Sequence, residues 1–238
     1  MLKVAAEGFF NASSYLLQLI KKAHETSTHI EYFQWMSQTS EYEAWLSNRK
    51  SDFLWHTDPH GEDTSLLVAS LLDMQWKATQ PKDLLKTCLA YYFCQAGTKF
   101  KLFAILQSIL AQLFQQQPEM VDRLVDTIRS SFKHKTTLLD SFSSNNADSN
   151  SRRTGLLTLF RVFMSLEWRI EVRIYFDNIS VLEQRDRHDL LTLILFIVQN
   201  HQRNCLKIFL TTTSCDEESL DLLKDYQFVD QNTERNSK

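Results

Sequence analysis

The stretch FLWHTDPHGEDTSLL, residues 53–67, has the residue order of a phosphate-binding loop. A short apolar run comes first, a turn with proline and glycine follows, and Thr64 and Ser65 open a run of Leu, Val and Ala. Such a loop needs glycines that let the backbone curl around phosphate, a lysine for the β- and γ-phosphates, and a hydroxyl for Mg²⁺. Thr64 and Ser65 supply the hydroxyls, but Glu62 and Asp63 stand in the region of the lysine.

Two further polar positions follow apolar runs that are typical of buried strands. The run VRIYFD ends at Asp177, and the run LKIFLTT ends in the threonines at 211–213. In an open sheet of parallel strands, ligands bind outside the carboxyl ends of the strands, which share one edge. We therefore expect the stretch 53–67, Asp177 and the threonines at 211–213 to lie at one edge of a sheet.

The same stretch contains the metal-binding residue types His56, Asp58, His60, Glu62 and Asp63. Imidazole and carboxylate groups suit zinc, manganese or iron, which makes a metal-dependent hydrolase an alternative. The spacing matches no established metal motif, however, and none of the four cysteines forms a C-x-x-C pair. We favour a solvated acidic turn with two exposed histidines, and we predict no metal site.

The order of apolar patterns predicts an α/β fold, in which a parallel sheet is flanked by helices and preceded by a helical lead. Trp35, Trp45, Trp55 and Trp76 are expected to pack this lead against the sheet. The predicted strands are 53–55, 89–95, 172–177 and 206–212, and the predicted helices after the lead are 64–77, 101–117, 118–132, 154–166 and 187–200.

Composition supports one sizeable core. The chain has 238 residues, of which 43% are hydrophobic. We predict a helical lead over 1–50, a domain over 51–228 and a polar tail over 229–238. Residues 140–153 lack periodicity and are rich in Ser and Asn, so we expect a flexible loop whose Arg152 and Arg153 serve solubility.

Charge and hydropathy exclude several classes of function. The net charge is −3 and the basic residues are scattered, so a nucleic-acid partner is not expected. The longest apolar run, LILFIV, is far shorter than the roughly 20 residues that span a bilayer, and the start of the chain lacks a signal-peptide pattern. We expect a cytoplasmic protein without a membrane partner.

Five segments, YEAWLSNRKSDFLW, CLAYYFCQAG, LFAILQSILAQLFQQQPEMVDRL, RIYFDN and LKIFLTT, occur in an order that resembles the NACHT domain of fungal STAND (NLR-like) proteins. Within that group, the chain is similar to the nephrocystin-type N-terminal P-loop NTPase subfamily, over about residues 30–215. The resemblance implies a P-loop-NTPase-like sheet and a switch in which bound ATP or GTP releases an oligomerising state.

Set against the family's P-loop, this chain departs at the positions that touch phosphate. His60 and Glu62 replace glycines and Asp63 replaces the lysine, while Thr64 and Ser65 keep the hydroxyl pair. A side chain at a glycine position obstructs the close approach of backbone to phosphate. Replacing Lys by Asp turns attraction into repulsion, a difference of several kcal/mol for charges about 4 Å apart at an effective dielectric of roughly 20.

The other two family motifs are altered in the same direction. Asp177 keeps the Mg²⁺-side acid of the Walker B strand, but Ser180 replaces its second acid, and Val181 replaces the residue that would polarise the attacking water. Thr213 replaces the arginine that follows the sensor strand. Valine accepts no proton, so three coherent losses predict that NTP hydrolysis is absent.

The resemblance therefore implies a catalytically inactive, pseudo-NTPase module that acts through protein contacts, with full-length STAND relatives among the partners. One alternative is weak binding of ATP or GTP with Mg²⁺, without turnover, through Thr64, Ser65 and Asp177. Another is a truncated or decayed gene product without a selected function. We expect no enzyme activity and no cofactor.

Overall fold

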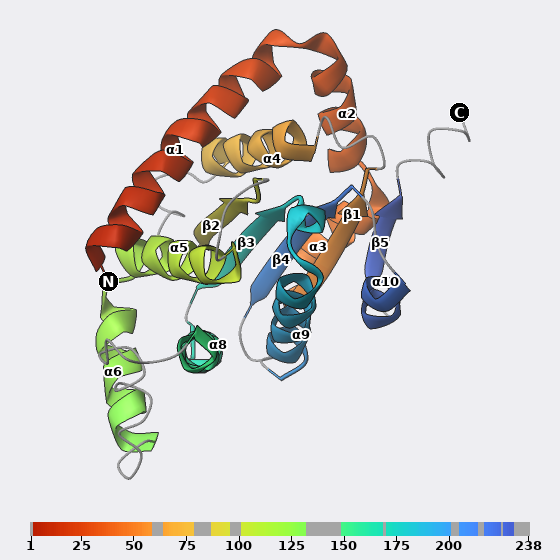
Figure 1. Ribbon diagram of the computed structural model, residues 1–238. Coiled ribbons are helices and arrows are strands. Elements are labelled where there is room, and N and C mark those ends of the chain that lie inside the picture. The colour runs from red at the N-terminus through yellow and green to blue at the C-terminus, as the bar shows by residue number, and fades with distance from the viewer. Residues whose placement is uncertain are drawn as a thin grey trace.

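The computed structural model describes residues 2–58, 64–78, 87–95, 101–131, 149–168, 170–200, 205–213, 217–224 and 226–230. Its centre is a five-stranded sheet in the order β2-β3-β4-β1-β5, and all neighbouring strands run parallel (Figure 1). The strands are β1 (Asp52–Thr57), β2 (Thr87–Phe93), β3 (Glu171–Asp177), β4 (Leu206–Thr212) and β5 (Gln227–Asp230). The predicted α/β class with a parallel sheet is confirmed.

Helices cover both faces of this sheet (Figure 1). The helical lead and α4 share one apolar core, and the later helices share the other. The first group comprises α1 (Leu2–Glu25), α2 (Ser27–Ser37), α3 (Ser40–Ser47) and α4 (Thr64–Ala78). The second comprises α5 (Lys101–Gln116), α6 (Glu119–Ser131), α8 (Ser149–Ser165), the short 3-10 helix η1 (Ile179–Val181), α9 (Gln184–Asn200) and α10 (Glu217–Leu223). None of the described helices is both long and apolar enough to cross a bilayer.

Aromatic side chains attach the helical lead to the sheet, as the sequence predicted for Trp45. This residue is completely buried, and its ring lies edge-on to Tyr175 of β3 and Phe209 of β4, at centroid distances of 6.2 and 6.0 Å. The expectation is wrong for Trp55, which belongs to the core on the opposite face, because alternate residues of β1 point to opposite sides. Trp76 lies edge-on to Tyr91 of β2 and is 39% exposed.

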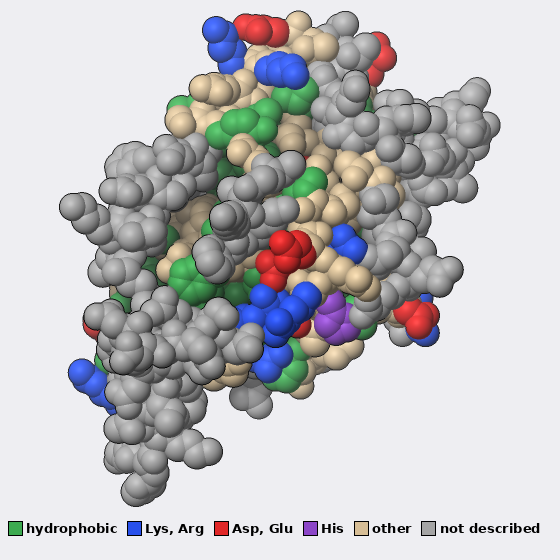
Figure 2. Space-filling model, viewed as in Figure 1, with side chains coloured by type: hydrophobic (Ala, Val, Ile, Leu, Met, Phe, Trp, Pro, Cys, Tyr) green, Lys and Arg blue, Asp and Glu red, His purple; other side chains and the backbone are tan. Residues whose placement is uncertain are grey.

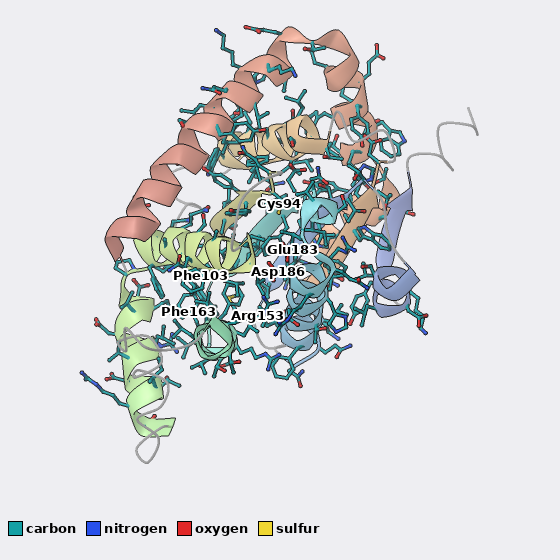
Figure 3. All side chains as sticks on the ribbon, in the orientation of Figure 1. Cys94, Phe103, Arg153, Phe163, Glu183 and Asp186 are labelled. Carbon is teal, nitrogen blue, oxygen red and sulfur yellow. The ribbon has the colours of Figure 1, made fainter. Side chains whose placement is uncertain are left out.

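The predicted boundary of the loop at residue 153 is wrong. Residues 149–153 form the start of α8, and residues 140–148 lie outside the described part of the chain. Arg153 contacts the start of α9 (Figure 3), where it pairs with Asp186 and, at 2.6 Å, with Asp189. Asp186 in turn accepts a hydrogen bond from the Leu102 backbone N–H at the start of α5, at 3.3 Å. Arg153 therefore links helices, in contrast to the expected solubilising role.

The end of the chain also differs from the prediction. Val229 and Asp230, assigned to a polar tail, belong to the edge strand β5, which pairs with β1. Residues 231–238 lie outside the described part of the chain.

The opposite edge of the sheet is covered by two glutamines of α5. Gln112 accepts a hydrogen bond from the Tyr91 backbone N–H at 3.0 Å and donates to the Tyr91 carbonyl at 2.8 Å. Gln116, one turn later, does the same for Leu89, at 3.0 and 2.7 Å. The outward backbone groups of β2 are thereby satisfied without another strand, which removes a template for edge-to-edge pairing.

We predict that Gln112→Ala lowers the free energy of unfolding by about 1–3 kcal/mol, because the Tyr91 N–H and C=O lose their partners in a buried position. Urea denaturation measures the change. Gln115→Ala is the matched control, since Gln115 is exposed on the same helix and should change stability little. Equal effects of the two substitutions would contradict the role assigned to Gln112.

Candidate functional site

The three polar positions anticipated from the sequence meet at the carboxyl edge of the sheet. Asp177, the last residue of β3, is completely buried. Its Oδ2 accepts a hydrogen bond from Ser65 Oγ in the first turn of α4, at 2.5 Å, and its Oδ1 accepts one from Thr211 Oγ1 of β4, at 2.8 Å. Both carboxylate oxygens are thus occupied by hydroxyl groups of the chain itself.

Burial dominates the electrostatics of Asp177. It raises the pKa of this carboxyl, and the neighbouring hydroxyls of Ser65, Thr211 and Thr64 offset only part of the effect. Thr64 Oγ1 is itself buried and lies near this carboxyl without forming a hydrogen bond of normal length within the described structure. Among the described residues, no lysine or arginine forms an ion pair with Asp177.

A second hydroxyl network joins the loop after β3 to the end of β4. Ser180 Oγ donates to Asn178 Oδ1 at 2.6 Å, accepts from the Thr213 backbone N–H at 3.1 Å, and lies 2.7 Å from Thr213 Oγ1. Ser180 and Thr213 are the positions at which the family resemblance placed an acid and an arginine. Here both positions carry neutral hydroxyls that contact each other.

Asn178 joins the two networks. It adopts a left-handed conformation, with φ of 50° and ψ of 57°, and its backbone N–H donates to Thr211 Oγ1 at 2.8 Å. Asparagine tolerates this conformation better than most residues, because its short polar side chain bonds locally. Asn178 was not among the residues selected from the sequence. Its position directly after the Asp that ends a strand could have indicated a left-handed turn.

Val181, the residue in the position that would polarise water, packs against the core on the α9 side of the sheet. Its side chain has neither acceptor nor donor, so it activates no nucleophile. His60, Glu62 and Asp63 lie outside the described residues, and the structure gives no information on these three positions.

The histidine-rich stretch differs from its prediction. His56 and Asp58 were expected in a solvated turn, yet they are 0% and 2% exposed. His56 lies in β1, and its Nε2 is 2.5 Å from the hydroxyl of Tyr32 in α2, with the Trp35 ring 6.2 Å from the imidazole between centroids. No group of three metal-ligating side chains occurs among the described residues.

Charge on the outer surface is balanced near this region. Figure 2 shows basic and acidic side chains side by side in the middle of the visible face, without a large patch of one sign. Ion pairs such as that of Arg153 with Asp189 contribute to this pattern. A charged surface that would attract a polyanion is not evident on the described part of this face.

The described site matches the Mg²⁺-binding part of a nucleotide site better than the phosphate-binding part. Ser65 and Asp177 provide oxygen atoms of the kind that bind Mg²⁺, and they lie together at a helix N-terminus. A described cation beside the second network, Arg187, donates to the Ser180 and Leu182 carbonyls at 3.2 and 3.3 Å. The described part of the site thus combines oxygen ligands of the kind that bind Mg²⁺ with a guanidinium that is bonded to backbone carbonyls.

We predict that Asp177→Asn stabilises the protein at neutral pH relative to wild type. The folded-state pKa of Asp177 is raised, so its protonated form favours folding, and this contribution is lost as pH rises through the raised pKa. The advantage of the variant should therefore shrink as pH falls below that pKa. Unfolding free energies from urea titrations at several pH values test this. A variant that is less stable by the same amount at every pH would contradict it.

We predict that Tyr32→Phe costs about 1–3 kcal/mol of stability, because His56 is buried and loses this hydrogen-bond partner. Chemical denaturation gives the value. Tyr15→Phe is the matched control, since Tyr15 also lies in the helical lead and packs edge-on against Phe93 through its ring. A larger loss from the control substitution would show that the Tyr32–His56 contact is not a main attachment of the lead.

Comparison with known proteins supports part of the family assignment. The sequence matches the family described as Nephrocystin 3, N-terminal, over residues 31–213, which include β1 to β4 and the polar networks around Asp177 and Ser180. No curated protein matches the chain. Because this match spans well over half of the sequence, the chain belongs to the nephrocystin 3 N-terminal family.

Proposed function

We propose that this chain is a catalytically inactive, NACHT-like module of the STAND type that acts through protein contacts rather than by hydrolysing nucleotide. The observation that carries the proposal is the neutral hydroxyl network at the carboxyl edge of the sheet. Ser180 and Thr213 bond to each other there, and Asp177 is satisfied by Ser65 and Thr211.

The network supports the proposal because each contact occupies a group that catalysis would need. A Mg²⁺ ion would compete with the hydroxyl bonds for the oxygens of Asp177, and the raised pKa of this carboxyl disfavours the charged form that binds metal. Ser180 and Val181 add neither negative charge nor a proton acceptor of useful basicity. The site is closed by interactions that stabilise the fold.

Weak ATP or GTP binding without turnover is the second candidate. It is favoured by the contact of Ser65 Oγ with Asp177 Oδ2, at 2.5 Å, and by the buried Thr64 hydroxyl near the same carboxyl, because these three side chains offer oxygens suited to Mg²⁺. Any such nucleotide would act as a ligand that stabilises one conformation, since the described residues include no group placed to activate water. The main proposal also includes a cytoplasmic location and full-length STAND relatives as partners.

The proposal predicts that millimolar ATP, ADP, GTP or GDP, with or without Mg²⁺, leaves the melting temperature unchanged and that no phosphate is released above buffer. A ligand at 100 times its Kd would stabilise by about 2.7 kcal/mol, which would shift a domain of this size by several degrees. Thermal-shift titration and a phosphate-release assay give the two readouts.

The variants Ser65→Ala and Ser70→Ala separate the outcomes, because both serines lie on α4 but only Ser65 contacts Asp177. A Mg²⁺-dependent shift lost only in Ser65→Ala, without phosphate release, would establish the second candidate in place of the first. Nucleotide turnover lost in the same variant would overturn both.

A further inference from the structure

A pocket of about 540 Å³ lies between α1, α2 and α4, on the helical lead and away from the polar networks. Figure 1 shows α1 and α2 meeting at an angle beside α4. Its walls are mainly apolar, with Ile20, Ala23, Ile30, Phe33, Met74 and Ala78 among the lining residues. The lining part of α4 is its second half, whereas Thr64 and Ser65 begin the same helix. The volume is within the range of small-molecule sites, which are mostly apolar with a few polar groups.

The polar groups of this pocket centre on Asp73. Asp73 Oδ2 accepts from Lys77 Nζ at 2.6 Å and lies 3.0 Å from His24 Nε2. The Asp73 side chain is only 18% exposed, whereas those of Lys77 and His24 are 65% and 60% exposed. Within the described residues no hydrogen bond reaches the other oxygen, Asp73 Oδ1. A recessed carboxylate with spare acceptor capacity therefore borders an apolar pocket.

We propose that this pocket binds a small amphipathic ammonium compound, with the apolar body between the helices and the ammonium group on Asp73. The Lys77 ammonium already binds Asp73 Oδ2, and this is the kind of contact that we propose for the ligand. The ligand's ammonium donates to Asp73 Oδ1 or takes the place of Lys77 on Oδ2.

Displacing Lys77 costs little. Lys77 and Asp73 are an i,i+4 pair whose lysine is largely in solvent, and such pairs contribute only a few tenths of a kcal/mol. An anionic head group would instead approach a recessed carboxylate, and the basic groups that could attract it are solvent-screened and already bonded to Asp73. The charge and exposure of these three residues thus favour a cation.

The test uses n-octylammonium as the probe, with octanoate and n-octanol as head-group controls of the same chain length, each titrated below its aggregation limit by calorimetry. We expect n-octylammonium to bind most tightly. Asp73→Asn should weaken its binding about two- to fivefold, the range expected for a partly exposed ion pair. Lys77→Met should strengthen it about twofold, because it removes the competing ammonium.

Ser70→Phe places a phenyl ring in the pocket from α4 and should weaken binding, with cooperative urea unfolding as proof of folding. Asp221→Asn and Lys224→Met are controls, since these residues form an exposed i,i+3 pair at the end of α10 and do not line the pocket, so neither change should alter the affinity. Tighter binding of octanoate, weaker binding by Lys77→Met, or full binding by a folded Ser70→Phe variant would each overturn the proposal.

Discussion

The buried carboxylate of Asp177 is the constraint on which the rest of this structure depends. A carboxyl group without access to water must be hydrogen-bonded, or its burial becomes costly. Its two oxygens accept from Ser65 and Thr211, so the end of β3, the start of α4 and the end of β4 are held together at one point. The left-handed Asn178 follows directly and turns the chain so that Ser180 reaches Thr213.

The same geometry supports the proposal that this chain acts without hydrolysing nucleotide. A carboxylate poised for Mg²⁺ needs to stay ionised and to exchange its protein contacts for a metal ion. Burial raises the pKa of Asp177, while hydroxyls in place of an acid and an arginine bond to one another. The hydroxyl bonds offset part of the cost of burying Asp177, and the remaining cost is expressed in the raised pKa of its carboxyl.

Much of the fold was predictable from local pattern, because buried strands and amphipathic helices leave periodic signals over many residues. The prediction that the stretch 53–67, Asp177 and the threonines at 211–213 share an edge was right, since parallel strand ends meet there and Ser65 and Thr211 bond to Asp177. Arg153 was misassigned because its partners, Asp186 and Asp189, lie more than 30 residues away in sequence. His56 was expected in solvent for a similar reason, as Tyr32 comes from a preceding helix. The four-residue strand β5 was too short to distinguish from a tail. Side-chain partners of this kind depend on tertiary contacts that local periodicity does not report.

Amide resonances of Asn178 and Thr213 provide the most direct test of the claim that the site is closed, because both N–H groups donate to network hydroxyls. The measurement is a heteronuclear NMR titration of the folded protein with Mg²⁺–ATP, followed at these two amides. The account predicts that neither their chemical shifts nor their hydrogen-exchange protection changes at millimolar nucleotide. Saturable shifts at both amides, with altered protection, would show that nucleotide opens the hydroxyl network and would contradict the account.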